Sequence, residues 1–98
     1  MEYKEIIDNL THDGAFYRWR AILYAISERI TDPDVLEAIS KLKKDKVMIL
    51  GRPVYAYAVA ALDILGAEKY TGDDPYALEL VNGLVDFKFE KPLNLDIP

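Results

Sequence analysis

The sequence contains no cysteine and a single histidine, and both shortages exclude chemistry. Without cysteine there are no disulfides, thiolate nucleophiles, iron–sulfur clusters or cysteine zinc sites. A metal site would have to use His12 or carboxylates alone, and His12 stands next to Asp13 rather than at a helical ligand spacing. We therefore expect no metal, no cofactor and no catalytic residue, and we interpret residues 11–14 as capping and turn chemistry.

Long apolar runs are also missing. The longest, residues 53–62, is too short to span a membrane and is followed by Asp63. The first five residues are charged and lack the apolar core of a secretory signal. We expect a cytoplasmic protein with no membrane partner.

Positive charge is in deficit, because the formal net charge is −5. Proteins that bind nucleic acids usually present a basic face, so we expect no nucleic-acid partner. The lysines within residues 41–46 are interpreted as a solvated helix end whose charge complements the helix dipole. Nucleic-acid binding through this run is the weaker alternative. An acidic chain also suits a basic protein partner, such as a toxin to be neutralised.

Apolar residues recur at helical spacing in five segments. Aspartate or threonine before proline favours a helix start, and glycine favours a helix end. These signals predict an all-α single domain over residues 1–98. Its helices cover about residues 3–10 and 16–30, a third segment opening at 31–34, about 53–65 with Gly66 as its cap, and a fifth segment opening at Asp74-Pro75.

Two segments do not have the helical period. Residues 47–50 are apolar and bounded by Gly51 and Pro53, which indicates a short strand or a buried connector. Residues 85–89 alternate apolar and charged side chains, the period of a strand. The sequence therefore allows a small two-stranded β element from residues 47–50 and 85–89, with residues 85–98 forming an extended tail.

The helical pattern also predicts which side chains are buried. In the second helix Trp19 belongs to an apolar stripe that begins at Phe16, whereas Tyr17 and Ala21 fall on the opposite side. Asp63 is the charged residue of an otherwise apolar helix. It is expected to be exposed or to pair with an arginine such as Arg52.

The chain contains an internal repeat. Ala25-Ile26 and Ala61-Leu62 occupy equivalent places in two apolar helices, and an Asp-Pro helix start follows each. Residues 32–39, residues 54–58, Ala61-Leu62 and Gly66 resemble the HEAT-like repeats of phycobilisome-lyase proteins, which would cover residues 15–84 with two HEAT-like helix pairs. Trp19 and Tyr55 stand where that family often has arginine.

The resemblance implies a short α-solenoid-like array that serves as a scaffold for protein contacts, with no catalytic residue that can be mapped. Two repeats are few for a stable stack, so the flanking segments would act as caps or a second chain would continue the stack as a homo-oligomer. A different compact helical fold is the alternative.

Tyrosine, tryptophan and arginine often dominate interface energetics. We expect Trp19 to be core, and we predict a partner-binding patch formed by Tyr17, Arg18, Arg52 and Tyr55. The predicted function is a non-catalytic protein–protein interaction module with an unidentified protein partner. The alternative is a small enzyme or accessory lyase-type subunit that binds a small molecule in an apolar pocket.

Overall fold

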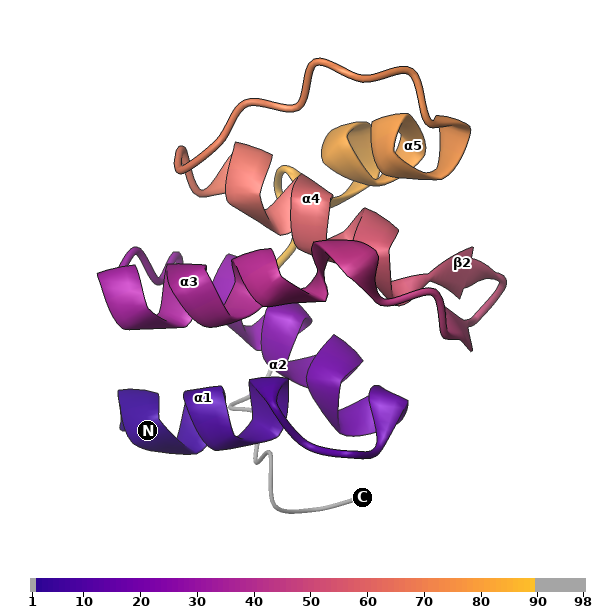
Figure 1. Ribbon diagram of the computed structural model, residues 1–98. Helices are drawn as coiled ribbons and strands as arrows, with labels where there is room; N and C mark the ends of the chain where they lie inside the picture. Colours follow the sequence, from indigo (N-terminus) through magenta and orange to yellow (C-terminus); the bar gives the residue numbers. More distant parts are fainter. Residues whose placement is uncertain (1, 90–98) are drawn as a thin grey trace.

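The computed structural model describes residues 2–89, and these residues form a mostly helical fold with one small antiparallel sheet (Figure 1). This confirms the mostly helical fold expected from the sequence. The elements are α1 (Tyr3–Leu10), α2 (Ala15–Ser27), α3 (Pro33–Lys41), the 3-10 turn η1 (Leu42–Lys44), β1 (Met48–Ile49), β2 (Arg52–Pro53), α4 (Val54–Ile64) and α5 (Pro75–Leu84).

The predicted Asp-Pro signals begin two of these helices. Asp32 accepts hydrogen bonds from the backbone amides of Asp34 and Val35 at the start of α3. Asp74 caps α5 in the same way. In both helices a proline fills the first turn, where its missing N–H leaves no helical bond unmade.

The equivalent helices α2 and α4 also end alike. Gly66, with φ of 78°, donates to the carbonyl of Asp63 while the next amide reaches back to Leu62. Arg29 adopts the same left-handed conformation after α2, with φ of 53°. Both ends have the pattern of a Schellman motif, and the predicted cap at Gly66 is confirmed.

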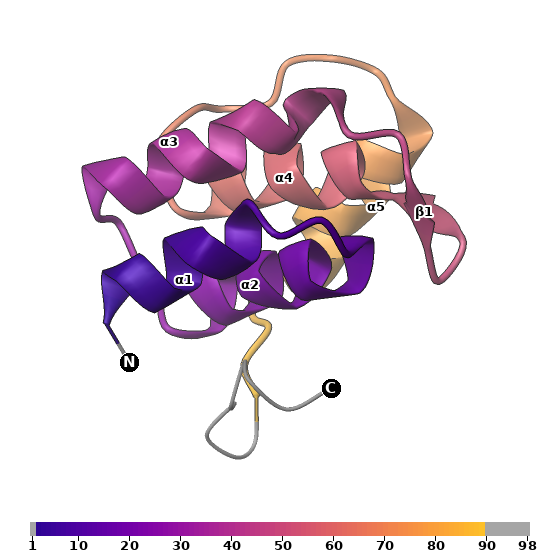
Figure 2. The same ribbon diagram turned by 60° about the horizontal axis from the view of Figure 1, so that its bottom comes forward.

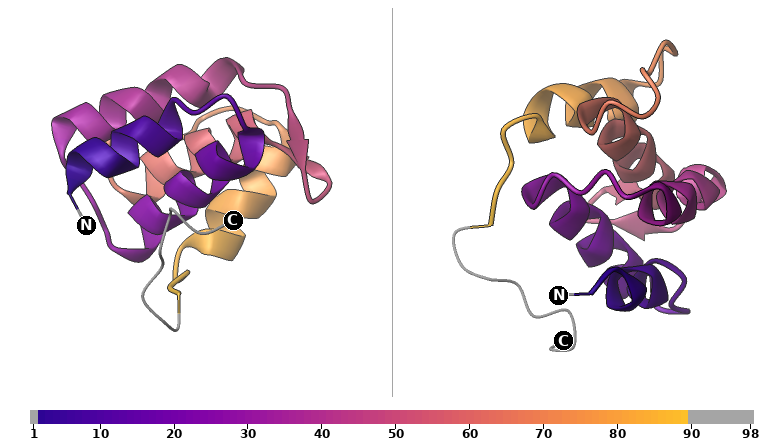
Figure 3. Two further views of the ribbon diagram at one scale, coloured as in Figure 1. Left: turned by 90° about the horizontal axis from the view of Figure 1, so that it is seen from below. Right: turned by 90° about the vertical axis from the view of Figure 1, so that its left-hand side faces the viewer.

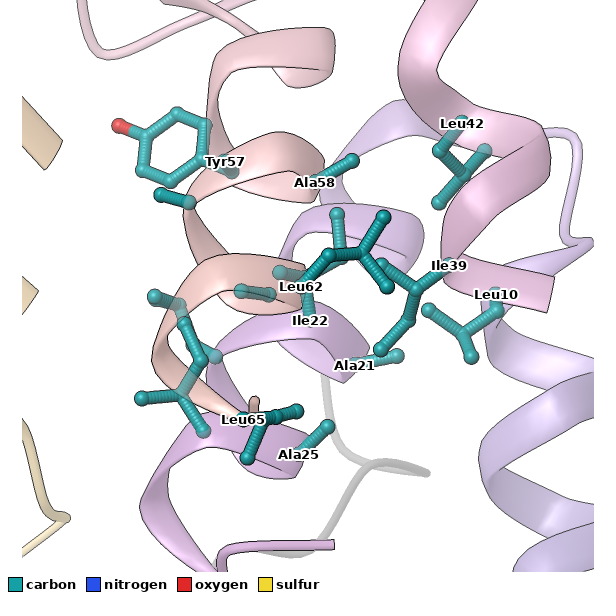
Figure 4. Close-up of a cluster of buried hydrophobic side chains, with 14 of the residues drawn as sticks. Leu10, Ala21, Ile22, Ala25, Ile39, Leu42, Tyr57, Ala58, Leu62 and Leu65 are labelled. Atoms are coloured by element: carbon teal, nitrogen blue, oxygen red, sulfur yellow. The ribbon is translucent and has the colours of Figure 1, made fainter. Parts of the chain in front are cut away.

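Helix α4 lies at the centre and packs against α2, α3, η1 and α5 (Figures 1 and 3). Seven of its eleven residues are buried, and four of these are alanines. Their small side chains let the neighbouring helices approach closely. Figure 4 shows this core around Ala58 and Leu62 of α4, with Ile22 of α2 and Ile39 of α3.

Helix α2 buries more of its surface than the single apolar stripe predicted for it. Ala21 is fully buried, so its predicted place on the opposite, outer side is wrong. The reason is that α2 packs against α1 as well as α4 and therefore buries two faces. Phe16, in the first turn, is 45% exposed, whereas Trp19 is half-buried and packs against the core.

The two strands of the sheet are neighbours in the chain. Met48 pairs with Pro53 and Ile49 with Arg52, so the predicted pairing of residues 47–50 with 85–89 is wrong. Residues 85–89 form no strand. Phe87 and Phe89 pack edge to face against each other instead, and the Phe89 amide donates to the Ser27 hydroxyl. The predicted tail at residues 90–98 lies outside the described part of the chain.

The hydrogen-bond partner of Asp63 is a backbone amide, which was not predicted from the sequence. Asp63 is half-buried, and its carboxylate accepts a hydrogen bond from the backbone amide of Tyr70, at 2.8 Å, rather than pairing with an arginine. The connection between α4 and α5 is anchored in this way. Helices α2 and α3 pack mainly against α1 and α4 rather than against each other. This packing does not show two stacked HEAT-like helix pairs, and that arrangement stays a prediction.

We expect Ile22→Ala to lower the free energy of unfolding by about 2–5 kcal/mol, because it leaves a cavity at the fully buried contact between α2 and its neighbours. Urea unfolding followed by circular dichroism measures the change. Leu78→Ala, at a position 42% exposed on α5, is the control and should cost less than about 1 kcal/mol. Equal losses in both variants would contradict the assigned core.

Candidate functional site

Arg18, one of the predicted partner-binding residues, is engaged within the protein. Its Nε donates to the Asp45 carboxylate at 2.8 Å, and its Nη1 donates to the carbonyls of His12 and Asp13. Only 14% of the Arg18 side chain is exposed. This arginine therefore joins the turn before α2 to the segment after η1.

The other three predicted residues also make internal contacts. Tyr17 lies against the His12 ring, with 4.2 Å between the ring centroids. Arg52 pairs with Glu79 of α5, and the Tyr55 hydroxyl donates to the Asp74 carboxylate. The last two contacts hold α5 against the start of α4, and a role for the four residues in partner binding stays a prediction.

The two most exposed large apolar side chains among the described residues, Leu50 and Met48, lie on the hairpin formed by β1 and β2, and the exposed Val47 directly precedes it. Leu50 is 74% exposed, Met48 52% and Val47 47%. In Figures 1 and 2 this hairpin extends from the side of the helical body, at the start of α4. In the sequence, the hairpin is visible as the apolar run 47–50 between lysines and a glycine. That run alone does not indicate that its side chains are exposed.

The hairpin turn has an unusual residue at its first central position. Leu50 and Gly51 form a two-residue loop with φ of 52° and 81°. Positive φ at both positions defines a type I′ turn, which strongly favours asparagine, aspartate or glycine. Leucine in this conformation costs about 1–2 kcal/mol. The tip therefore combines local strain with an apolar side chain in water.

Asp45 fixes the base of the hairpin. One carboxylate oxygen accepts from Arg18, the other from the Val47 amide at 3.1 Å, and its backbone carbonyl accepts from the Tyr55 amide. The Val54 amide donates to the Val47 carbonyl. The hairpin segment thus caps the first turn of α4, which has no side-chain cap of its own.

Lysines surround a hollow beside the hairpin. Lys43, Lys44, Lys46 and Tyr55 line this open hollow of about 530 Å³, called here the lysine hollow. The Lys43 ammonium pairs with Glu68, at 2.8 Å. Within residues 2–89, Lys44 and Lys46 form no ion pair. Their charges are therefore available to a molecule that binds there.

A groove lies between α2, α4 and α5. It has a volume of about 360 Å³ and is lined mainly by apolar side chains, including Trp19, Leu80 and Phe87, with Arg52 and Glu79 also lining it. The indole Nε1 of Trp19 is enclosed and has no hydrogen-bond partner among the described residues. The exposed Leu50 side chain does not line this groove.

Residues 2–89 contain no group of three or more histidine, cysteine, aspartate or glutamate side chains placed to hold a metal ion. The same residues include no helix long and apolar enough to cross a membrane. Comparisons of the chain with protein-family models, curated proteins and solved structures find no match. The resemblance to HEAT-like repeats therefore stays a prediction, and the site must be interpreted from its own geometry.

We expect Leu50→Asn to raise the free energy of unfolding by about 1 kcal/mol, because asparagine tolerates the left-handed conformation of the turn. Gly51→Ala should lower it by about 1 kcal/mol for the opposite reason. Chemical denaturation of the two variants measures both changes. A loss of stability in Leu50→Asn would contradict the turn assigned here.

The Tyr55–Asp74 hydrogen bond should make stability depend on pH at both extremes. It lowers the pKa of the Asp74 carboxyl and raises the pKa of the Tyr55 phenol. Because the carboxyl pKa is lower in the folded protein, the carboxylate stabilises the native state at every pH above its pKa in the unfolded chain. That stabilisation is lost as the pH falls through the folded pKa. A raised phenol pKa gives stabilisation that is lost as the pH rises through its folded value.

Tyr55→Phe should therefore be less stable than the unchanged protein near neutral pH, with a difference that shrinks at acid and alkaline pH. Thermal unfolding across the pH range measures this, and Tyr76→Phe on the exposed side of α5 is the control. A difference independent of pH would show that packing, not this hydrogen bond, is what the hydroxyl contributes.

Proposed function

We propose that this chain is a non-catalytic protein-interaction module that docks a partner on the hairpin surface, defined as Val47, Met48 and Leu50 with the adjoining Lys44 and Lys46. The cytoplasmic location expected from the sequence belongs to this proposal. The surface differs from the predicted patch of Tyr17, Arg18, Arg52 and Tyr55, whose side chains make contacts within the protein.

The observation that carries the proposal is Leu50. Its side chain is 74% exposed and its backbone is strained, so it contributes neither core burial nor a favourable turn. Positions where a sequence departs from its local structural preference are commonly functional. An exposed apolar side chain on a projecting hairpin gives a partner area to bury, at about 25 cal/mol per Å².

Binding of a small molecule in an apolar pocket is the alternative, and the groove lined by Trp19 and Phe87 is the place for it. The enclosed indole N–H of Trp19 is the feature that favours this alternative, since a bound acceptor could satisfy it. The groove is open, and the charged groups that line it among residues 2–89, Arg52 and Glu79, pair with each other. The hairpin surface is the better supported site.

The proposal predicts that a partner captured from the native host by the unchanged protein is lost with Leu50→Asn and with Met48→Ser. Neither change removes a buried side chain, so folding should be retained. Leu78→Gln, which replaces an equally apolar side chain 42% exposed on α5, is the matched control and should keep the partner. Mass spectrometry identifies the captured proteins.

Capture of the same proteins by all four forms would contradict docking on the hairpin surface. Loss of capture with Leu78→Gln alone would place the partner on α5. Binding should then be repeated with the purified partner, so that affinity rather than recovery is compared.

A further inference from the structure

The basic residues of this acidic chain are densest in the segment that runs from the end of α3 through η1 into the hairpin. Residues 41–52 contain five of the twelve lysine and arginine residues and one of the seventeen acidic residues, while the net charge of the whole chain is −5. The remaining residues are therefore strongly acidic. An electrostatic field of this kind orients a charged partner toward the basic end.

The single acidic residue of this segment does not neutralise the lysines. Asp45 is bound by Arg18 and by the Val47 amide, and 11% of its side chain is exposed. Three of the five basic residues have acidic partners: Lys41 pairs with Glu37, Lys43 with Glu68 and Arg52 with Glu79. Within the described residues, the uncompensated charge of this segment therefore belongs to Lys44 and Lys46, next to the apolar tip in the chain.

We infer that the partner segment is acidic as well as apolar: its apolar side chains cover Met48 and Leu50, and a carboxylate enters the lysine hollow. This inference rests on the proposed function and names the chemistry of the partner. About 13 Å separates Lys46 from Leu50 along an extended chain, a span that one short peptide segment covers.

The shape and charge of the region favour a protein segment over other anions. The lysine hollow is an open site lined by four residues, an extent that matches a short peptide segment rather than a planar bilayer. Two uncompensated lysines and a small apolar tip give only marginal attraction to an anionic membrane. A long nucleic acid would extend past the basic segment and meet the acidic remainder of the surface.

Fluorescence anisotropy with short labelled peptides tests this inference. The probe is an amphipathic peptide of leucine and glutamate. A second peptide has glutamine in place of glutamate, and a third has serine in place of leucine. A double-stranded DNA oligonucleotide and vesicles of phosphatidylserine with phosphatidylcholine are the other arms. Each is titrated at about 50 mM and about 300 mM salt, because screening weakens exposed charge pairs.

We expect the leucine–glutamate peptide to bind most tightly and to weaken at the higher salt. Lys44→Glu combined with Lys46→Glu should weaken it roughly tenfold. Lys4→Glu combined with Lys69→Glu changes the net charge equally at exposed sites elsewhere and should have little effect. Leu50→Asn should weaken both leucine-containing peptides.

Equal binding of the glutamine peptide, with no effect of the Lys44 and Lys46 changes, would overturn the acidic partner and leave docking on the hairpin intact. Tighter binding of DNA or of the vesicles would overturn it in favour of those partners. If no peptide binds, or if Leu50→Asn has no effect on any of them, both the acidic partner and the proposed function fail.

Discussion

The burial of α4 on nearly all sides is the constraint on which the rest of the structure depends. Its alanines allow α2, α3 and α5 to pack closely around one short helix. A domain of this size has little core to spare, so each of these contacts matters to stability. Because these neighbours hold α4 in place, its first turn is held too, and the hairpin leaves the helical body at that point. The central helix thus decides where the exposed tip is presented.

A small set of polar contacts holds the base of the hairpin to the helical body. Asp45 binds Arg18, the Val47 amide and, through its carbonyl, the Tyr55 amide, so α2, the hairpin and α4 meet at one residue. Partly buried ion pairs of this kind are costly to break, because each leaves an uncompensated charge. Using Asp45 in this way also removes the one negative charge that would otherwise offset the neighbouring lysines. Structural support and surface charge are therefore linked through a single side chain.

Local signals made the helices predictable, and the absence of such signals explains what was missed. Asp32, Asp74 and Gly66 act within their own helix ends, so their roles follow from neighbouring residues. The hairpin was missed because Leu50-Gly51 lacks the asparagine–glycine signature of its turn. The alternation in residues 85–89 was misleading because Phe87 and Phe89 pack on each other, with no partner strand. The partners of Arg18 and Arg52 each lie 27 positions away, and sequence spacing cannot supply such pairings.

We propose that the partner docks on the hairpin surface and not in the groove between α2, α4 and α5. Nuclear magnetic resonance spectra of the nitrogen-15-labelled protein, titrated with the leucine–glutamate peptide, locate the contact residue by residue. If the peptide docks on the hairpin surface, the amide shifts concentrate in residues 43–52 and at Tyr55. Shifts concentrated around Trp19, Leu80 and Phe87, with an unchanged hairpin, would contradict the proposal.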